Sequence, residues 1–276
     1  MLDSRANTAG IDLGGCLAKI AHGDDPFQLA TFPASNLDAV IAYLKAHNLS
    51  HLVLTGGGSI KQRAAFAEFH VVTTSEFEAS ARGANYLLER QGGAAFPYML
   101  VSIGTGTSIS KVDRTSCQRV TGTGVGGGTL LGLGSVLTGQ DTYDKIIGKA
   151  TSGDRSGVDT LVRDIYDGDL PGLGGDVTAA NFGKVASRQP EDLGRAALQM
   201  VGEVIAVIAS LAAKNVSAQE VLYVGGALRD NPALAQVLES ITQFMGQRSR
   251  FVQRGEYVGA IGALLQATDE RTMQDG

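Results

Sequence analysis

The 276-residue chain contains no tryptophan, six prolines and only two cysteines, Cys16 and Cys117. The cysteines form no Cys-x-x-Cys pair and have no histidine near them in the sequence. Disulfide scaffolds and structural zinc sites need several such ligands at short spacings. We therefore expect both cysteines to be free thiols and expect neither kind of scaffold.

The chain also lacks an excess of positive charge and long hydrophobic runs. Lysine and arginine total 23 against 28 acidic residues, a net charge of -5 at pH 7, and they form no cluster. Nucleic-acid binding leaves a basic patch, so this balance argues against a nucleic-acid partner. No apolar run reaches the ~20 residues that span a membrane, and residues 1–6 lack the hydrophobic region of a signal peptide. We expect a cytoplasmic protein with no membrane partner.

Glycine, by contrast, is abundant: 37 residues, distributed without low complexity. At this length, with 43% hydrophobic residues, the chain can bury one large core or two lobes of roughly 100–150 residues each. Glycine lets the backbone turn sharply or approach a ligand closely. The glycine clusters therefore mark the candidate sites.

The first cluster lies in the segment 10–21, which reads Gly-Ile-Asp-Leu-Gly-Gly-Cys-Leu-Ala-Lys-Ile-Ala. Two apolar runs separated by Gly14-Gly15 predict a tight β-hairpin. Asp12 and Lys19 flank the turn, whose free N–H groups can face an anion, so a metal-chelated polyphosphate would meet both charges. A glycine turn alone is a weak signal, and a strand-end Asp with an exposed Lys is the alternative interpretation.

Further clusters follow the same outline of strand, glycine turn and strand or helix. Segment 99–112 repeats the opening hairpin, which indicates a duplicated lobe. Segment 119–138 is a glycine loop that runs into an expected helix, and a helix N-terminus behind such a loop favours anions. Segments 52–58 and 221–232 read as buried strands that end in glycine turns.

Apolar spacing predicts helices over 37–46, 76–89 and 192–214, the last with the strongest stripe. Methionine and leucine in that stripe indicate core or subunit contact rather than a ligand site. Segment 142–182 is dense in Asp and Gly and predicts short helices and loops. No linker of flexible composition is present, so we expect a hinge between the lobes.

Taken in order, the clusters resemble a known family. The chain carries Gly-Ile-Asp-x-Gly-Gly-x-x-x-Lys, Ile-Gly-Thr-Gly-Thr-Ser, Arg-Val-Thr-Gly-Thr-x-x-Gly-Gly-Gly-Thr-x-x-Gly-Leu and Gly-Asp-x-Thr-Ala-x-Asn-Phe-Gly, and ends in Tyr-Val-Gly-Ala-Ile-Gly-Ala-Leu at 257–264. This series is similar to that of the type II pantothenate kinases and covers nearly the whole chain. The resemblance implies an α/β fold of two duplicated lobes, that of the actin-like ATPase and sugar kinase superfamily, with the nucleotide in the cleft between them. We expect the lobes at 1–98 and 99–276.

The same resemblance implies an activity and its partners. The expected reaction is transfer of the ATP γ-phosphate to the primary hydroxyl of pantothenate, the first step of coenzyme A biosynthesis. ATP and Mg²⁺ are the expected cofactors, and coenzyme A or an acyl-CoA is an expected regulator. The family also implies a homodimer, for which the helix at 192–214 is a candidate contact.

Residue roles follow from the family motifs. Glu76, in Glu76-Phe77-Glu78-Ala79, matches the family's general base, since a primary alcohol needs a carboxylate to accept its proton. Asp12 is expected to hold Mg²⁺ through water, and Lys19 to offset phosphate charge. A solvated glutamate at a helix start is the alternative interpretation of Glu76. Glu78 is the neighbour that could be mistaken for the base.

Substrate and nucleotide contacts follow in the same way. Arg119 matches the arginine that binds the pantothenate carboxylate, and Thr105 and Ser108 stand where the family uses hydroxyl groups against the substrate; a surface salt bridge and simple turn residues are the alternatives. The segment from Asp176 to Phe182 is expected near the cleft. The expected nucleotide contacts are Gly14, Gly15, Cys16, Leu17, Lys19, Gly104, Thr121, Gly126, Gly127, Gly128, Gly225 and Gly226.

Cys16 departs from the family pattern, which has Thr at this position, so a thiol replaces a hydroxyl donor at the phosphate turn.

Two other functions stay open. One is a kinase of the same superfamily that acts on another small molecule, such as an amino sugar, although the zinc-cysteine motif of one sugar kinase group is absent. The other is a nucleotide- or CoA-binding regulator that has lost catalysis. An iron–sulfur activator ATPase is disfavoured, because neither cysteine lies in a cluster-binding setting.

Overall fold

The computed structural model describes residues 7–166, 172–218 and 220–274. Residues 1–6, on which the expectation about a signal peptide rests, lie outside the described residues. The first sheet has the strand order β3-β2-β1-β4-β5, with β1 antiparallel to β2 and parallel to β4. Its strands are β1 (Thr8–Leu13), β2 (Leu17–His22), β3 (Gln28–Pro33), β4 (His51–Thr55) and β5 (His70–Thr73).

The second sheet repeats this arrangement. Read from β8, its order is β8-β7-β6-β11-β12, with β6 antiparallel to β7 and parallel to β11, as β1 is to β2 and β4. The duplicated lobe that the two similar hairpins indicated is therefore confirmed. The strands are β6 (Tyr98–Ile103), β7 (Thr107–Val112), β8 (Cys117–Thr123), β11 (Glu220–Val224) and β12 (Arg248–Phe251).

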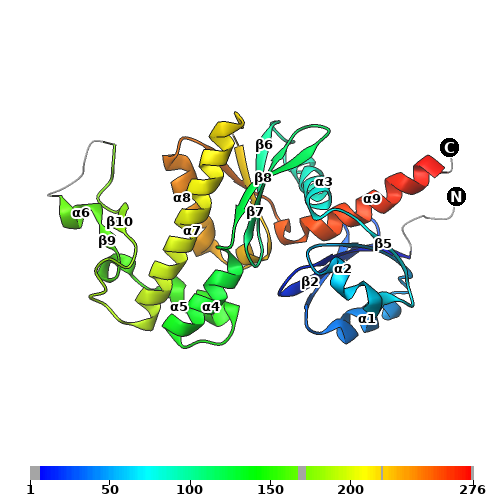
Figure 1. Cartoon of the computed structure of the whole chain (residues 1–276), viewed down its shortest axis with the longest axis horizontal. Coiled ribbons are helices and arrows are strands. Elements are labelled where there is room, and N and C mark those ends of the chain that lie inside the picture. Colours follow the sequence, from blue (N-terminus) through cyan, green and yellow to red (C-terminus); the bar gives the residue numbers. More distant parts are fainter. Residues whose placement is uncertain (1–6, 167–171, 219, 275–276) are drawn as a thin grey trace.

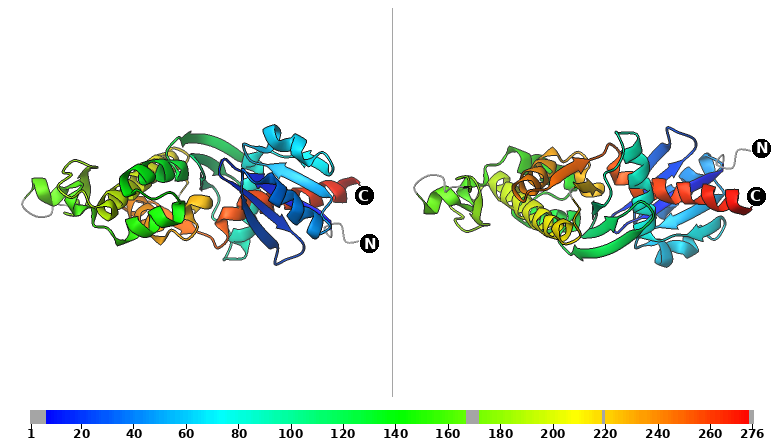
Figure 2. Two further views of the ribbon diagram at one scale, coloured as in Figure 1. Left: turned by 90° about the horizontal axis from the view of Figure 1, so that it is seen from below. Right: turned by 90° about the horizontal axis from the view of Figure 1, so that it is seen from above.

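Helices lie in three layers around and between the sheets (Figure 1, Figure 2). Leu44 and Phe66 pack on one face of the first sheet, beside Ile11 and Leu54. The second sheet is covered by a core that includes Ile205 and Val237. The outer helices are α1 (Leu37–Ala46), α2 (Ser59–Gln62) and η1 (Arg63–Phe66) on the first lobe, and α4 (Gly127–Thr138), α5 (Tyr143–Ser152), α7 (Pro190–Asn215) and α8 (Pro232–Phe244) on the second.

Helices α3 (Glu76–Glu89) and α9 (Val258–Gln274) form the middle layer. Leu88 of α3 and Leu264 of α9 share one core with Leu100 and Leu222 of the second sheet. Helix α9 also packs along β1, β2 and β4, although it belongs to the second lobe in sequence. The division at residue 98 stays a prediction. The crossing places the beginnings of α3 and α9 beside the first hairpin.

The predicted helices 37–46 and 76–89 are confirmed, and 192–214 lies within α7. The Asn36 side chain accepts a hydrogen bond from the Ala39 N–H at 3.2 Å, as a helix N-cap does. Helix α7 is long and apolar enough to cross a membrane, but 67% of its apolar window is buried in the protein. It is therefore the core helix of the second lobe.

The predicted short helices and loops of 142–182 are found, together with a small sheet that the sequence did not indicate. Its part that contains β9 (Thr160–Leu161), α6 (Val162–Ile165) and β10 (Thr178–Ala180) lies at the end of the molecule away from the first sheet, whereas α5 lies beside α4 (Figure 1). The carboxylate of Glu203 on α7 accepts hydrogen bonds from Thr178 at 2.5 Å and from Asn181 at 3.0 Å, which fixes the segment to α7. The remaining short elements are η2 (Arg155–Gly157), η3 (Gly226–Leu228) and η4 (Gly255–Tyr257).

Candidate active site

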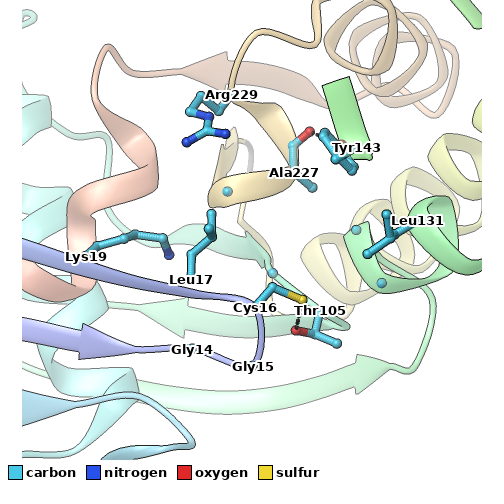
Figure 3. Close-up of a pocket in the computed structure, with 14 residues that line it drawn as sticks. Gly14, Gly15, Cys16, Leu17, Lys19, Thr105, Leu131, Tyr143, Ala227 and Arg229 are labelled. Atoms are coloured by element: carbon cyan, nitrogen blue, oxygen red, sulfur yellow. Dashed lines mark hydrogen bonds between the residues drawn. The ribbon is translucent and has the colours of Figure 1, made fainter. Parts of the chain in front are cut away.

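The turns of the two homologous hairpins face each other across the cleft. Cys16 Sγ lies 3.7 Å from Thr105 Oγ1, and a Cβ added to Gly15 would lie 2.6 Å from the same oxygen (Figure 3). A side chain at Gly15 would therefore require the Thr105 side chain to move. The duplication of the lobes thus brings two glycine turns, with their backbone N–H groups, to one place.

A cavity opens at this meeting point (Figure 3). Leu17 and Lys19 of β2 border it on one side, and Leu131 of α4 and Tyr143 of α5 on the other. The N-terminal residues of α4, which the sequence predicted as an anion-favouring helix start, reach it as well. The full lining is Gly14, Gly15, Cys16, Leu17, Lys19, Gly104, Thr105, Gly127, Gly128, Leu131, Tyr143, Gly226, Ala227 and Arg229.

Asp12 and Lys19 stand opposite each other in the first hairpin and form an ion pair. Lys19 Nζ lies 3.1 Å from Asp12 Oδ2, and the side chains are 11% and 16% exposed. Partial burial strengthens such a pair, because water screens it less. The hairpin therefore presents a carboxylate and an ammonium group held in fixed positions beside the cavity.

Glu76 is the first residue of α3, and its side chain is exposed. Partial desolvation raises the pKa of its carboxyl above the usual range, and the charge of Asp12 raises it further, while Lys19 lowers it. Asp12 and Lys19 are therefore close enough to Glu76 for their charges to act on its carboxyl. Two carboxylates of unlike environment around one lysine are an arrangement suited to proton transfer beside a phosphate.

Ser108 and Arg119 lie on the neighbouring strands β7 and β8. Ser108 pairs with Gly122 in the sheet, and Arg119 Nη2 is 2.6 Å from where a Cβ of Gly122 would lie. Within the described part of the chain, Arg119 has no ion-pair partner and the buried Ser108 Oγ has no hydrogen-bond partner. A buried hydroxyl without a partner is rare in native proteins. The Ser108 hydroxyl therefore has unused hydrogen-bonding capacity, and the Arg119 side chain is exposed.

Comparison with known proteins matches this chain to one family. The family model described as Fumble matches residues 18–266. A type II pantothenate kinase of Oceanobacillus iheyensis is 37% identical over 93% of this chain and 98% of the relative, and one of Staphylococcus aureus strain USA300 is 36% identical over 92% and 97%. The chain belongs to the type II pantothenate kinase family.

Solved structures support the fold of this kinase. An activator of 2-hydroxyisocaproyl-CoA dehydratase from Clostridium difficile, with bound ADPNP, superimposes with a TM-score of 0.63 at 15% identity, over 97% of this chain and 96% of that one. A ROK family glucokinase from Streptomyces griseus, in complex with glucose and AMPPNP, gives 0.58 at 13% identity, over 95% and 99%. The expected two-lobed fold of the actin-like and sugar kinase superfamily is confirmed.

Most of the expected nucleotide contacts of this type II pantothenate kinase line the cavity. Thr121, Gly126 and Gly225 do not: Thr121 pairs with Ile109 in the sheet, and the two glycines pack behind the cavity. Gly225 has φ +111°, and a side chain there would overlap the Ile103 backbone. For these three residues, direct contact with a ligand stays a prediction.

Two further expectations concern Thr105 and the segment from Asp176 to Phe182. Thr105, expected at the substrate, lies in the cavity against Gly15 and Cys16. The segment from Asp176 to Phe182, expected near the cleft, is bound to α7 at the far end of the kinase, because Glu203 of α7 accepts hydrogen bonds from Thr178 and Asn181.

Four lining residues of the kinase were not predicted: Leu131, Tyr143, Ala227 and Arg229. The Tyr143 hydroxyl donates to the Ala227 carbonyl at 2.6 Å and accepts from Asn231 Nδ2 at 3.0 Å. Burial raises the pKa of Tyr143 to about 12, so the hydroxyl keeps its proton. Tyr143 follows the glycine-rich helix but belongs to no motif, and only its aromatic ring beside a predicted site could have suggested a role.

Proposed function

We propose that this protein transfers the γ-phosphate of ATP to the primary hydroxyl of pantothenate, with Glu76 as general base. The observation that carries the proposal is the cluster of Glu76, Asp12 and Lys19 beside a cavity between two glycine turns, in a chain whose relatives are named type II pantothenate kinases. Glu76 accepts the hydroxyl proton as the oxygen bonds to the γ-phosphorus, and the bond to the leaving ADP oxygen breaks.

The cavity is proposed to hold ATP. The two glycine turns and the N-terminus of α4, with Gly127 and Gly128, supply N–H groups for the phosphates. Lys19 offsets the charge that moves onto the leaving oxygens. Tyr143 and Leu131, away from the turns in Figure 3, are proposed to contact the adenine base.

Mg²⁺ is proposed to enter with the nucleotide. The described residues contain no group of three or more His, Cys, Asp or Glu side chains that could hold a metal by themselves. Mg²⁺ fits this donor set, because it keeps several waters and takes one or two carboxylates together with substrate phosphates. Asp12 is the residue that would hold it, and the ion would neutralise phosphate charge.

Pantothenate is proposed to lie between α3 and strands β7 and β8. The guanidinium of Arg119 can bind the acceptor carboxylate through two N–H donors, as a planar fork does. Ser108 Oγ would donate to a polar group of the acceptor. Both assignments rest on side chains that have no partner among the described residues: Ser108 Oγ lacks a hydrogen bond and Arg119 lacks an ion pair. Helix α3 packs against the same sheet.

An acceptor panel tests the proposal. ADP release with MgATP would be measured with pantothenate, with N-acetylmannosamine and glucosamine, and without an acceptor. Turnover that requires pantothenate is expected. Turnover with an amino sugar alone would establish the other small-molecule kinase, and ADP binding without transfer to any acceptor would establish the regulator.

Ser108 gives a test of the acceptor site. Ser108→Ala is expected to raise the KM for pantothenate about fivefold through loss of about 1 kcal/mol of hydrogen bonding, without lowering the melting temperature, because its hydroxyl is already unpartnered. Ser110→Ala is the matched control, since Ser110 is buried and hydrogen-bonded to Cys117. Ser110→Ala should have a lower melting temperature than the parent and an unchanged KM for pantothenate. The same KM for Ser108→Ala and parent would remove Ser108 from the site.

Tyr143 gives a test of the nucleotide site. Tyr143→Ala is expected to raise the KM for ATP about tenfold, because base stacking on an aromatic ring contributes about 1–3 kcal/mol. Tyr143→Phe keeps the ring and should stay within threefold of the parent. Steady-state kinetics with ATP varied measure both, and the KM for pantothenate should not change. A Tyr143→Ala enzyme with unaltered KM for ATP would contradict the placement.

The homodimer and regulation by coenzyme A stay predictions of the family resemblance. Val207 and Leu211 on α7 are 37% and 54% exposed, which supports this helix as a candidate subunit contact. Sedimentation at several protein concentrations measures the oligomeric state.

A further inference from the structure

Two glycine motifs take no part in the proposed chemistry, yet each places one glycine against the Asp12 side chain. They are the turn after β4, at 55–58, and the beginning of α9, at 257–264. Ile11 and Leu13 of β1 belong to the outer core of the first lobe, whereas Gly10 and Asp12 face the alternate side, against α9. The carboxylate of Asp12 therefore enters the space between these two motifs.

Both motifs contact the Asp12 side chain closely. A Cβ at Gly259 would lie 3.0 Å from Asp12 Cγ and 3.1 Å from Oδ2, closer than the 3.5–4.0 Å of an optimal contact. On the other side, a Cβ at Gly56 would lie 2.5 Å from Oδ1. Lys19 Nζ, 3.1 Å from Oδ2, bounds the carboxylate in a third direction. Asp12 thus occupies a slot between two glycines and a lysine.

Helix α9 cannot easily move away from this slot. A side chain at Gly262 would overlap the carbonyl of Ala79 on α3, and one at Gly83 would overlap the carbonyl of Val258, so the two helices touch through their backbones. Gln266 of α9 also accepts a hydrogen bond from Thr74, just before α3. A methyl group at position 259 is therefore expected to shift the Asp12 side chain by a few tenths of an ångström rather than to move the helix.

We propose that Gly56 and Gly259 fix the carboxylate of Asp12, and that Gly259 is a positioning residue for phosphoryl transfer that acts through Asp12. The proposal rests on the proposed function, because Asp12 is there the ligand side chain for the nucleotide-borne metal. It assigns to the glycine motif of α9 the placement of Asp12 relative to Lys19 and Glu76. A misplacement of about 1 Å can cost about 10²-fold in rate, so a shift of a few tenths of an ångström is expected to lower the rate by a smaller factor.

Gly259→Ala tests the proposal, with Gly148→Ala as the matched control. Gly148 is also a helical glycine, but a Cβ there meets nothing within 4 Å. Gly259→Ala is expected to lower kcat about tenfold and to leave the KM for pantothenate within twofold, whereas Gly148→Ala keeps both values. A parent-like kcat in Gly259→Ala would overturn the proposal.

Thermal unfolding supplies a second measurement that does not depend on activity. Gly259→Ala is expected to lower the melting temperature in the parent, and to lower it much less in an Asp12→Ala background, because the crowded Cγ and Oδ2 atoms are then absent. Equal losses in the two backgrounds would show that the methyl group disturbs helix packing instead, and would overturn the proposal.

Binding of ADP separates this proposal from the proposed function. Calorimetry with and without Mg²⁺ measures how much the metal strengthens ADP binding, and no acceptor is needed. The gain is expected in the parent and in Gly148→Ala, and is expected to fall at least threefold in Gly259→Ala. An undiminished gain in Gly259→Ala would overturn the role of Gly259, whereas absence of pantothenate turnover in the parent would overturn only the proposed function.

Discussion

Replacement of Glu76 by glutamine is expected to lower kcat about 10³-fold, within the range of about 10²–10⁴ that general-base catalysis contributes. Glutamine has nearly the same shape but cannot accept the hydroxyl proton. The KM for ATP and the melting temperature should stay near the parent values, because Glu76 is exposed, does not line the nucleotide cavity and is the first residue of α3. Pantothenate-dependent ADP release measures the effect.

Glu78→Gln is the matched control, because Glu78 lies two residues further along in the same first turn of α3. Glu78 lines a different groove, with Cys117 and Arg114, outside the nucleotide cavity. It should keep most of the parent kcat. If Glu78→Gln lost the activity and Glu76→Gln kept it, the base would be Glu78.

The pH dependence of kcat/KM follows from the same assignment. Glu76 acts only when ionised, and its pKa is raised by desolvation and by Asp12. Activity is therefore fully present above this pKa and is lost as the pH falls through it, at a higher pH than for an ordinary glutamate. Asp12→Asn removes one of the charges that raise the pKa, so the acidic limb of the profile should shift to lower pH.

Local pattern was sufficient for the hairpins and for several helices. The hairpin around Gly14-Gly15 and the helix at 37–46 are determined by residues that are near one another in the sequence: apolar runs on either side of a glycine turn, and an apolar face behind a capping residue. Both elements were found where predicted. The repeated hairpin also indicated the duplication, because each lobe encodes its own turn. The order of the glycine motifs indicated the family.

The cavity and the Asp12 slot depend on contacts that no local pattern contains. Tyr143 becomes part of the cavity only because its hydroxyl bonds to Ala227, 84 residues along the chain. Gly56 and Gly259 meet Asp12 through strand pairing and helix crossing, which residue spacing does not report. The small sheet of β9 and β10 likewise depends on Glu203, a charged residue of a distant helix.

Arg119→Ala is expected to lower kcat/KM for pantothenate about 100-fold, mainly through a higher KM. Hydrogen bonds to charged groups contribute about 1.5–3 kcal/mol, and a factor of 100 corresponds to about 2.7 kcal/mol. Arg119→Lys keeps the charge but not the planar pair of donors, so an intermediate loss of about tenfold is expected. Stability should change little, because Arg119 is exposed and forms no ion pair within the residues that the structure describes.

The charge of the acceptor decides whether Arg119 has this role. Pantothenol, which has a neutral alcohol in place of the carboxylate, should be a poorer acceptor for the parent and should lose less than about threefold in kcat/KM on Arg119→Ala. Arg114→Ala is the matched control: Arg114 is an exposed arginine of the same hairpin that lies over the Phe96 ring, 5.4 Å from its centroid. Arg114→Ala should keep the parent values of kcat/KM for both pantothenate and pantothenol. Equal losses with pantothenate and pantothenol in Arg119→Ala would show that the guanidinium supports the strand face around Ser108 and Gly122 rather than binding the carboxylate.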